Sequence, residues 1–333
     1  MASRSTLQDR IQALLTKYEP QIRDAFLASI SDITNRAKLG AIIAALERGD
    51  IEGALAAVHV EPAAFQPLES AIRTGFVQAA TTTAAAIPAQ VVVRFDARNP
   101  AAEQWLSTHS SQAIVEIVAD QRTAVRIALT DGMARGDNPR TTALNVVGRI
   151  GQSGRREGGI VGLTSQMERY VANARAELTS GNPVTMRGYF TRLRRDKRFD
   201  GIVLKAIKDG KPVDAATVSR LTSRYADRLL ALRGETIGRT ESMASIHEAQ
   251  HQAYLQAVGK GAVKASAVRR TWIATKDSRT RDSHRHLDGT TVGLNERFPN
   301  GCLFPGDPSA DIAEIANCRC HLMVRIDRLS NLE

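Results

Sequence analysis

Residues 259–274 read GKGAVKASAVRRTWIA, and they divide the chain into two kinds of structure. Before them, apolar residues recur at helical spacing in a sequence rich in alanine, the residue that costs least to hold in a helix. After Gly261 the pattern changes, because residues 268–274 alternate like a β-strand and residues 322–326 form a second strand-like run. The sequence therefore predicts a mostly α-helical body followed by a small α+β C-terminal module.

Glycines and turn residues suggest four segments along the chain. Residues 1–150 are expected to form an N-terminal helical region. The stretch GQSGRREGGIVG at residues 151–162 is expected to be a linker, because its five glycines keep the backbone mobile. Residues 163–261 are predicted to be a second helical region, which leads into the C-terminal module at residues 262–333.

Two local signals bear on helix ends within the body. Ser5-Thr6-Leu7-Gln8 fits a capping box, with Ser5 as the N-cap residue and Gln8 reaching back to it. A long helix is predicted from about residue 213 to residue 258, with Gly234 as the point where it could break.

The chain carries 45 lysines and arginines against 35 aspartates and glutamates, a formal net charge of +10. Such an excess favours association with polyanions such as nucleic acid, although solubility alone would also explain it. The densest basic cluster could be a solvated helix face or a contact for DNA or an acidic partner. Its members are Arg187, Arg192, Arg194, Arg195, Lys197 and Arg198.

The sequence also bears on the compartment. It has no run of eighteen apolar residues, so no membrane span is expected, and its start, MASRSTLQDR, lacks the apolar segment of a signal peptide. Synthesis in the cytoplasm, with reduced thiols, is therefore expected. Cys302, Cys318 and Cys320 all lie near the C-terminus, which suggests a local role rather than a disulfide framework.

Cysteine and histidine could form a zinc site in the module, because zinc takes four nitrogen or sulfur ligands in a tetrahedron. Cys318 and Cys320 are two residues apart, so both thiolates could point to one side of an extended chain. The other ligands could come from His284, His286, His321 and Cys302. A single C-x-C pair is a weaker zinc signal than paired C-x-x-C motifs, so reduced cysteines packed under the loops are the alternative.

A small loop-rich module has little apolar area, so it needs polar networks, a metal or a partner surface to hold its shape. Asp277 and Arg281 are four residues apart and could pair across a turn. Asp307 lies between a glycine and a proline, a setting that suits capping or pairing with an arginine.

The segment His247-Glu248-Ala249-Gln250-His251 matches H-E-x-x-H on a predicted helix. At this spacing both imidazoles fall on one face and could bind zinc, with Glu248 as the general base of a metalloprotease. A third ligand is required, and the extended form H-E-x-x-H-x-x-G-x-x-H is absent. The alternative is a solvated helix that carries two histidines.

The C-terminal module contains an ordered series of motifs, which are Trp272, the segment from Asp277 through Arg281 to His284, Asp288-Gly289, Pro305-Gly306-Asp307-Pro308 and Asn317-Cys318-Arg319-Cys320. Together these motifs resemble those of the phage Mu F-like head-morphogenesis proteins, also called minor capsid proteins. Upstream, Ile237-Gly238-Arg239-Thr240-Glu241 resembles the helix that precedes the domain in this family. Cys302 and His286 fall outside the family pattern, so the resemblance favours His284, Cys318 and Cys320 as ligands. Trp272, Asp277, Arg281, Asp288 and Asp307 are expected to form the structural network.

The resemblance implies a structural, non-enzymatic protein of a tailed bacteriophage. Such a protein would be made in the host cytoplasm and built in few copies into the virion head, in the interior near the portal vertex. Its partners would be the portal protein, other head proteins and the packaged double-stranded DNA, with which it could be ejected. DNA contact through phosphates requires no sequence reading. The alternatives are a zinc metalloprotease and a nonspecific DNA-binding protein without head association.

Overall fold

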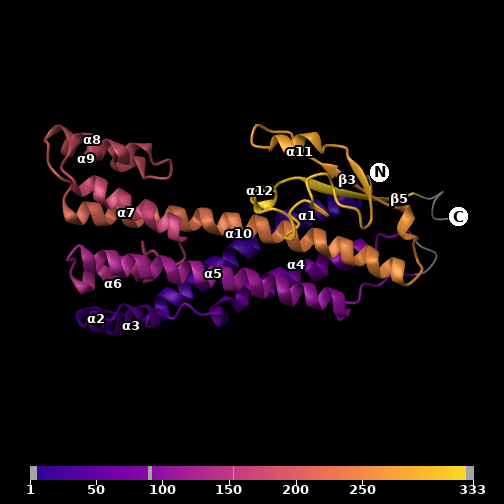
Figure 1. The fold of residues 1–333 in the computed structure, drawn as a ribbon, viewed down its shortest axis with the longest axis horizontal. Helices are drawn as coiled ribbons and strands as arrows, with labels where there is room; N and C mark the ends of the chain where they lie inside the picture. The colour runs from indigo at the N-terminus through magenta and orange to yellow at the C-terminus, as the bar shows by residue number, and fades with distance from the viewer. Residues whose placement is uncertain (1–5, 89–91, 153, 328–333) are drawn as a thin grey trace. The chain divides into compact units, whose positions relative to one another are not determined.

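The computed structural model shows a chain that is mostly helical, with a three-stranded antiparallel sheet near its C-terminal end (Figure 1). The structure describes residues 6–88, 92–152 and 154–327. The predicted fold class, a helical body with a small α+β module, is confirmed. None of the described helices is both long and apolar enough to cross a membrane. The chain forms two compact units, made of residues 1–26, 67–112 and 235–333 and of residues 27–66 and 113–234.

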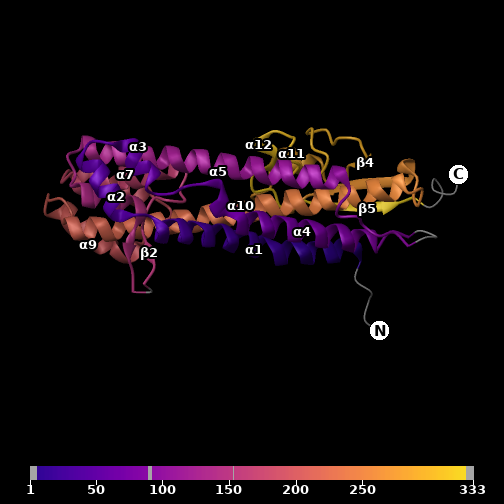
Figure 2. The ribbon, with the colours of Figure 1, turned by 90° about the horizontal axis from the view of Figure 1, so that it is seen from below.

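The long helices that contribute to the first unit are α1 (Leu7–Arg36), α4 (Gln66–Ala84), α5 (Pro100–Ala134) and α10 (Ala215–Gly259) (Figure 2). The residues of α1, α5 and α10 are divided between the two units. Gly238 lets α10 approach α1 closely, because a Cβ atom at this position would lie 2.5 Å from the backbone oxygen of Glu19. On the other side of the unit, Phe76 of α4 stacks on Trp105 of α5, with ring centroids 5.4 Å apart.

The sheet of the first unit has β3 (Val268–Ile273) at its centre, paired antiparallel with β4 (Thr291–Gly293) and β5 (His321–Ile326). Short helical segments precede and connect the strands, and they are η4 (Ala265–Ala267), α11 (Asp282–His286) and α12 (Ile312–Ile315). Both strand-like runs predicted from the sequence are therefore strands, and β3 alternates between buried and more exposed residues as its pattern indicated.

Arg270 and Trp272 fill the buried side of β3. The Arg270 guanidinium donates hydrogen bonds to the backbone carbonyls of Gly293, Glu296 and Leu303, so it ties the central strand to the loops that follow β4. Trp272 meets the ring of His284 edge-on, with centroids 5.1 Å apart. The central strand thus positions both the loops and the histidine of the module.

The second unit contains short helices and a small hairpin. These elements are α2 (Leu39–Glu47), α3 (Ile51–Ala56), η1 (Pro62–Phe65), α6 (Pro139–Val147), β1 (Arg149–Ile150), β2 (Arg156–Glu157), α7 (Ser165–Thr179), α8 (Pro183–Arg187), η2 (Gly188–Thr191), η3 (Lys197–Phe199) and α9 (Asp200–Lys208). Polar N-cap side chains begin many of the helices by accepting hydrogen bonds from backbone N–H groups of the first turn, as Thr164 does for α7 and Asn182 for α8.

One local expectation differs from the structure, and others are untested or fall outside the described residues. Helix α10 continues through Gly234, so the possible break does not occur. Within the predicted linker, a Cβ atom at Gly158 would lie 2.2 Å from the side chain of Ser223, so this glycine is tightly packed, and the linker itself stays a prediction. The domain boundaries drawn from the sequence stay a prediction. Ser5 lies outside the described residues, and Thr6 caps α1 through reciprocal hydrogen bonds with Asp9.

Candidate metal centre of the C-terminal module

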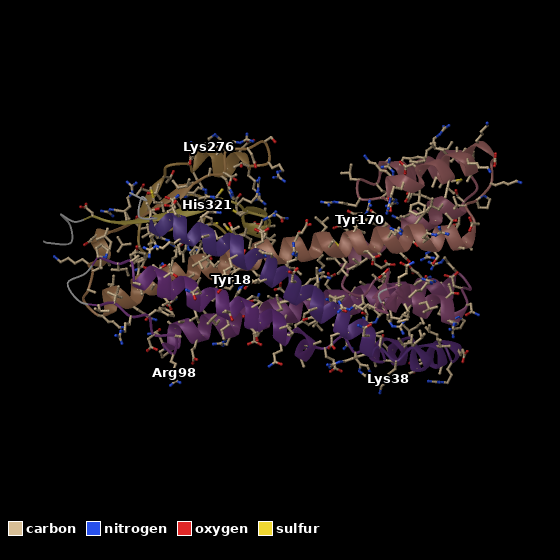
Figure 3. All side chains as sticks on the ribbon, turned by 180° about the vertical axis from the view of Figure 1, so that it is seen from behind. Tyr18, Lys38, Arg98, Tyr170, Lys276 and His321 are labelled. Atoms are coloured by element: carbon tan, nitrogen blue, oxygen red, sulfur yellow. The ribbon has the colours of Figure 1, made fainter. Side chains whose placement is uncertain are left out.

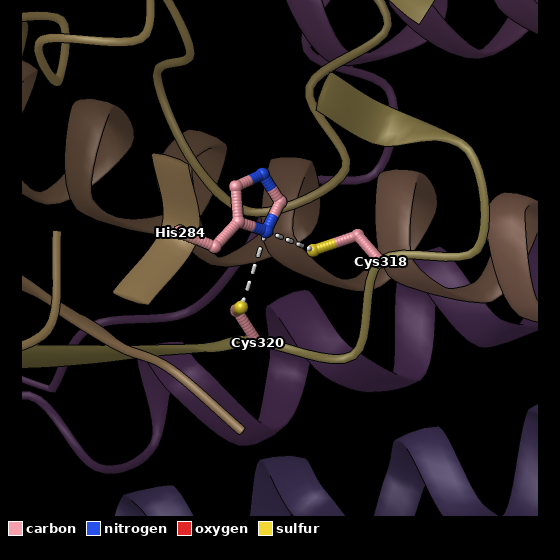
Figure 4. Close-up of side chains that lie close together, drawn as sticks. All are labelled: His284, Cys318 and Cys320. Atoms are coloured by element: carbon pink, nitrogen blue, oxygen red, sulfur yellow. Dashed lines mark hydrogen bonds between the residues drawn. The ribbon is translucent and has the colours of Figure 1, made fainter. Parts of the chain in front are cut away.

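His284, Cys318 and Cys320 come together in the module (Figure 4). The sulfurs of Cys320 and Cys318 lie 3.4 and 3.7 Å from Nδ1 of His284, and the three ligand atoms all lie within 4.8 Å of one another. All three residues are buried. Together, one imidazole nitrogen and two sulfurs could hold a metal ion.

The backbone around Cys318 explains how residues so far apart meet. Asn317 adopts a φ of 55°, in the left-handed region that asparagine tolerates better than most residues. The N–H of Cys318 then donates to the carbonyl of Ile315 at 3.1 Å, which closes a turn directly after α12. The side chain of Arg281, at the start of α11, donates to the carbonyl of Ala316 and joins this turn to the histidine helix. Both sulfurs consequently point towards the His284 ring (Figure 4).

The other nitrogen of the His284 ring faces a carboxylate. Nε2 lies 2.9 Å from a carboxylate oxygen of Glu314, which also accepts hydrogen bonds from Ser283 and Asn300. Burial pushes the pKa of Glu314 upwards, but the hydrogen bonds from Asn300 and Ser283 and the neighbouring His284 outweigh burial, so the pKa is lowered overall. A carboxylate on the far nitrogen of a ligand histidine is the usual second contact in metal sites. Sequence reasoning missed Glu314, because no motif contains it.

The two thiols differ in acidity because they share a hydrogen bond. That bond, with burial adding to it, raises the pKa of Cys318 above its ordinary value. The same bond lowers the pKa of Cys320 against the opposing effect of burial, and hydrogen bonds from His284 and from the backbone of Thr275 lower it further. The shared hydrogen bond therefore favours one thiolate within the pair, which suits a metal site because the thiolate is the form that binds metals.

Asp277 belongs to a polar network beside the cluster, but its partner is not the one considered from the sequence. It forms a two-pronged ion pair with Arg319, with a distance of 2.9 Å on one side, instead of pairing with Arg281. This hydrogen bonding from Arg319 lowers the pKa of Asp277 below its usual range. The pair anchors the Cys-Arg-Cys segment to the loop that follows β3.

Asp288 and Asp307 each order a loop of the module. Asp288 accepts the backbone N–H of Ala274 at 3.0 Å and lies 3.4 Å from the ammonium of Lys276, on the outer loop of the module (Figure 3). Asp307 is buried and accepts the N–H of Leu303 at 2.7 Å, and Arg297 lies 3.1 Å away. Both carboxylates therefore accept backbone hydrogen bonds and pair with nearby cations of the module.

The H-E-x-x-H residues are buried in the helix α10, so the expectation of a solvated helix face is wrong. Nδ1 of His247 lies 2.7 Å from the carbonyl of Pro305, and Glu248 accepts a 2.7 Å hydrogen bond from Gln252. Burial lowers the pKa of both His247 and His251 to about 4 and raises that of Glu248 to about 7. Within the described ranges, His247 and His251 belong to no group of three metal-binding side chains. These residues pack the Pro-Gly-Asp-Pro loop against α10.

The remaining candidate ligands lie outside the cluster. His286 is exposed on α11. Cys302 is fully buried, and burial together with the nearby Asp307 carboxylate raises its pKa to about 12. His321 lines an open pocket of about 250 Å³ that also has Cys318 and Arg239 in its wall. Residues of the Arg-Thr-Glu and Cys-Arg-Cys segments thus line one pocket.

The basic cluster predicted at residues 187–198 is only partly free. Three of its six members bind carboxylates, in the pairs Arg192–Glu177, Arg195–Asp200 and Arg198–Asp196. The side chains of Arg187, Arg194 and Lys197 are exposed and form no ion pair with any residue that the structure describes. Half of the cluster is therefore occupied within the fold, and half faces solvent.

Comparison with known proteins finds a family that the C-terminal part of the chain resembles. Residues 198–323 match the family described as Phage Mu protein F like protein, so the predicted resemblance is confirmed for this part of the chain. A curated relative, "Uncharacterized protein YqbB" of Bacillus subtilis (strain 168), is 30% identical over 133 residues. The aligned part covers 38% of this chain and 41% of that protein, so the chain spans about two fifths of the length of this relative. No solved structure matches the chain.

Proposed function

We propose that this protein is a minor head protein of a tailed bacteriophage and that it acts in head morphogenesis. The observation that carries the proposal is the Mu F-like region at residues 198–323. Two of its motifs are joined by the Asp277–Arg319 pair, and the motif residue His284 contacts Glu314, an arrangement that suits a rigid docking module better than a site of turnover. The partners would be the portal protein and other head proteins. We infer a structural rather than an enzymatic role.

Virion composition tests this proposal. The protein should be found in purified heads, in few copies and near the portal vertex, after assembly in the host cytoplasm. Mass spectrometry of purified particles and immunogold labelling would measure both. Particles that assemble, package DNA and infect normally without the polypeptide would contradict the proposal.

We propose further that the protein lies beside packaged DNA, contacts it without sequence preference and can be ejected with it. The net charge of +10 supports this, because phosphate contacts depend on charge and not on base sequence. Binding to duplexes of unrelated sequence should be equal and should weaken steeply as salt rises. Sequence preference or salt-independent binding would contradict the proposed DNA contact. Retention of the protein in heads that have released their DNA would contradict the proposed ejection.

We propose that the ion held by His284, Cys318 and Cys320 is a structural zinc. A nitrogen and two thiolates are ligands that zinc prefers, and Glu314 would orient the histidine ring by accepting a hydrogen bond from Nε2. The part of the chain that the structure describes supplies three ligands, so a fourth ligand from outside this cluster would be needed for the closed tetrahedron of a structural zinc site. The ion would join α11 to the segment that leads into β5, in a module whose helices are only a turn or so long.

Metal content of the purified full chain tests the zinc proposal. The wild type should contain close to one zinc per chain, and Cys320→Ser and His284→Ala should lose it. Cys302→Ser is the matched control, because Cys302 is an equally buried cysteine outside the cluster and its replacement should leave the zinc in place. Wild-type protein purified without zinc, and unable to take up added Zn²⁺ or Co²⁺, would overturn the proposal.

A further inference from the structure

One part of the second unit concentrates the positive charge of the chain. Residues 183–211, which form α8, η2, η3 and α9, are called the basic lobe here. The lobe contains nine lysines and arginines and three aspartates, so its 29 residues carry a net charge of +6 out of +10 for the whole chain. Nitrogen-tipped side chains extend from it into solvent (Figure 3). A charge of this density in so few residues indicates a surface for an acidic partner.

The ion pairs within the lobe neutralise only part of this charge. Asp196 is buried and binds Arg198, and Asp200 binds Arg195. The exposed cations without an ion pair to any described residue are Arg187, Arg194, Lys197, Lys205, Lys208 and Lys211. Asp209 is the one exposed aspartate among residues 183–211. The positive field of the lobe therefore faces outwards.

The same lobe exposes large apolar side chains. Leu193 is 91% exposed between two arginines, Val184 is 76% exposed, and Leu204 and Ile202 are exposed on α9. These are four of nine exposed large hydrophobic residues in the described chain, although the lobe is less than a tenth of it. The core of the lobe does not need them, because it is formed by Met186, Val203 and Ile207. Large apolar side chains exposed at this density on one small lobe indicate a protein contact more often than single exposed ones do.

We propose that the basic lobe docks an acidic, amphipathic segment of a partner protein. The free cations match acidic side chains of such a segment, and exposed apolar side chains such as Leu193 would contact its apolar residues. Nonspecific DNA contact uses phosphates and would leave these apolar side chains in water, so the charge alone does not explain the lobe. The proposal rests on the proposed function for its setting, since the partner would be another head protein, but the binding chemistry can be tested on the purified chain.

Two variants of the full chain separate the apolar and the charged contributions. The apolar variant is Leu193→Gln with Ile202→Gln and Leu204→Gln. It keeps the net charge, and glutamine is well tolerated in helices. The charge variant is Arg194→Gln with Lys197→Gln, Lys205→Gln and Lys208→Gln. Fluorescence anisotropy would measure binding to a Glu-rich helical peptide with a leucine stripe, to the same peptide with serine replacing leucine, and to a 30-base-pair duplex, with circular dichroism confirming that each variant folds.

The wild type should bind the leucine-striped peptide at least tenfold more tightly than the serine peptide. The apolar variant should lose that tenfold advantage while binding the duplex as the wild type does, and the charge variant should bind all three probes more weakly. Equal peptide binding by the wild type and the apolar variant would overturn the proposal, as would no binding of the striped peptide. A parallel loss of duplex binding in the apolar variant would instead assign the lobe to nucleic acid. Absence of the protein from virions would sink the proposed function without changing any of these results.

Discussion

A carboxylate oxygen of Glu314 lies 2.9 Å from Nε2 of His284, and Nδ1 of the same ring faces the sulfurs of Cys318 and Cys320. Each nitrogen of one imidazole therefore has a distinct neighbour. A carboxylate on Nε2 would hold the proton there and leave the lone pair of Nδ1 for a metal, so Glu314 would orient His284 as a ligand.

Glu314→Gln should weaken zinc binding by about 10–100-fold without removing any ligand, because the amide orients the ring less firmly and does not raise its basicity. Competition with a chromophoric chelator would measure the change. Asp311→Asn is a suitable control, since Asp311 caps the same short helix and asparagine keeps the cap. Equal zinc affinity in the wild type and Glu314→Gln would show that Glu314 does not support the metal.

Glu248→Gln should stabilise the protein at pH 8 by about 1–3 kcal/mol. Burial raises the pKa of Glu248 to about 7 in the folded state, above its ordinary value of 4.5. Unfolding therefore releases a proton between these values, and the wild type loses stability as pH rises from about 4.5 to about 7. Glutamine has no proton to lose, so the difference between the two proteins should be small at pH 4.5 and constant above pH 7.

Urea unfolding at several pH values would measure this difference, and His247 and His251 titrate in both proteins and so largely cancel. The same variant examines the metalloprotease alternative. Processing of head proteins that stops in Glu248→Gln phage would show that Glu248 acts as a general base, whereas unchanged processing agrees with a structural role.

Arg270→Met should destabilise the protein by at least about 3 kcal/mol, because it leaves three backbone carbonyls in the module without their donor. Arg269→Met on the same strand is the matched control, since Arg269 is exposed, and it should change stability by less than about 0.5 kcal/mol. Denaturant unfolding of both variants measures the contrast. If Arg270→Met unfolds at the same denaturant concentration as the control, the guanidinium does not hold the loops.

Gly238→Ala should cost about 1–3 kcal/mol, because its methyl group would meet the backbone of α1 at Glu19 and force the two helices apart. Gly201→Ala in α9 has open space around the new methyl group and should stabilise the helix by about 0.5–1 kcal/mol. Opposite shifts in melting temperature are expected for the two substitutions. A neutral Gly238→Ala would mean that the approach of α10 to α1 is less close than the structure has it.

Local pattern was enough to predict the division of this chain into a helical body and a C-terminal module. Helical spacing and strand alternation are properties of neighbouring residues, so residues 268–274 and 322–326 could be recognised as strands before their partners were known. The series of motifs from Trp272 to Cys320 was equally readable, and the family match at residues 198–323 confirms the resemblance that it carried.

Only the tertiary structure decided which of these residues meet. His284 is brought to Cys318 and Cys320, whereas Cys302 and His286 are not, and Glu314 joins the cluster although no motif names it. Likewise, only the structure shows that the H-E-x-x-H residues are buried and packed within the fold instead of facing solvent. These outcomes depend on segments some 30 to 60 residues apart in the chain, and short-range periodicity holds no information about such contacts.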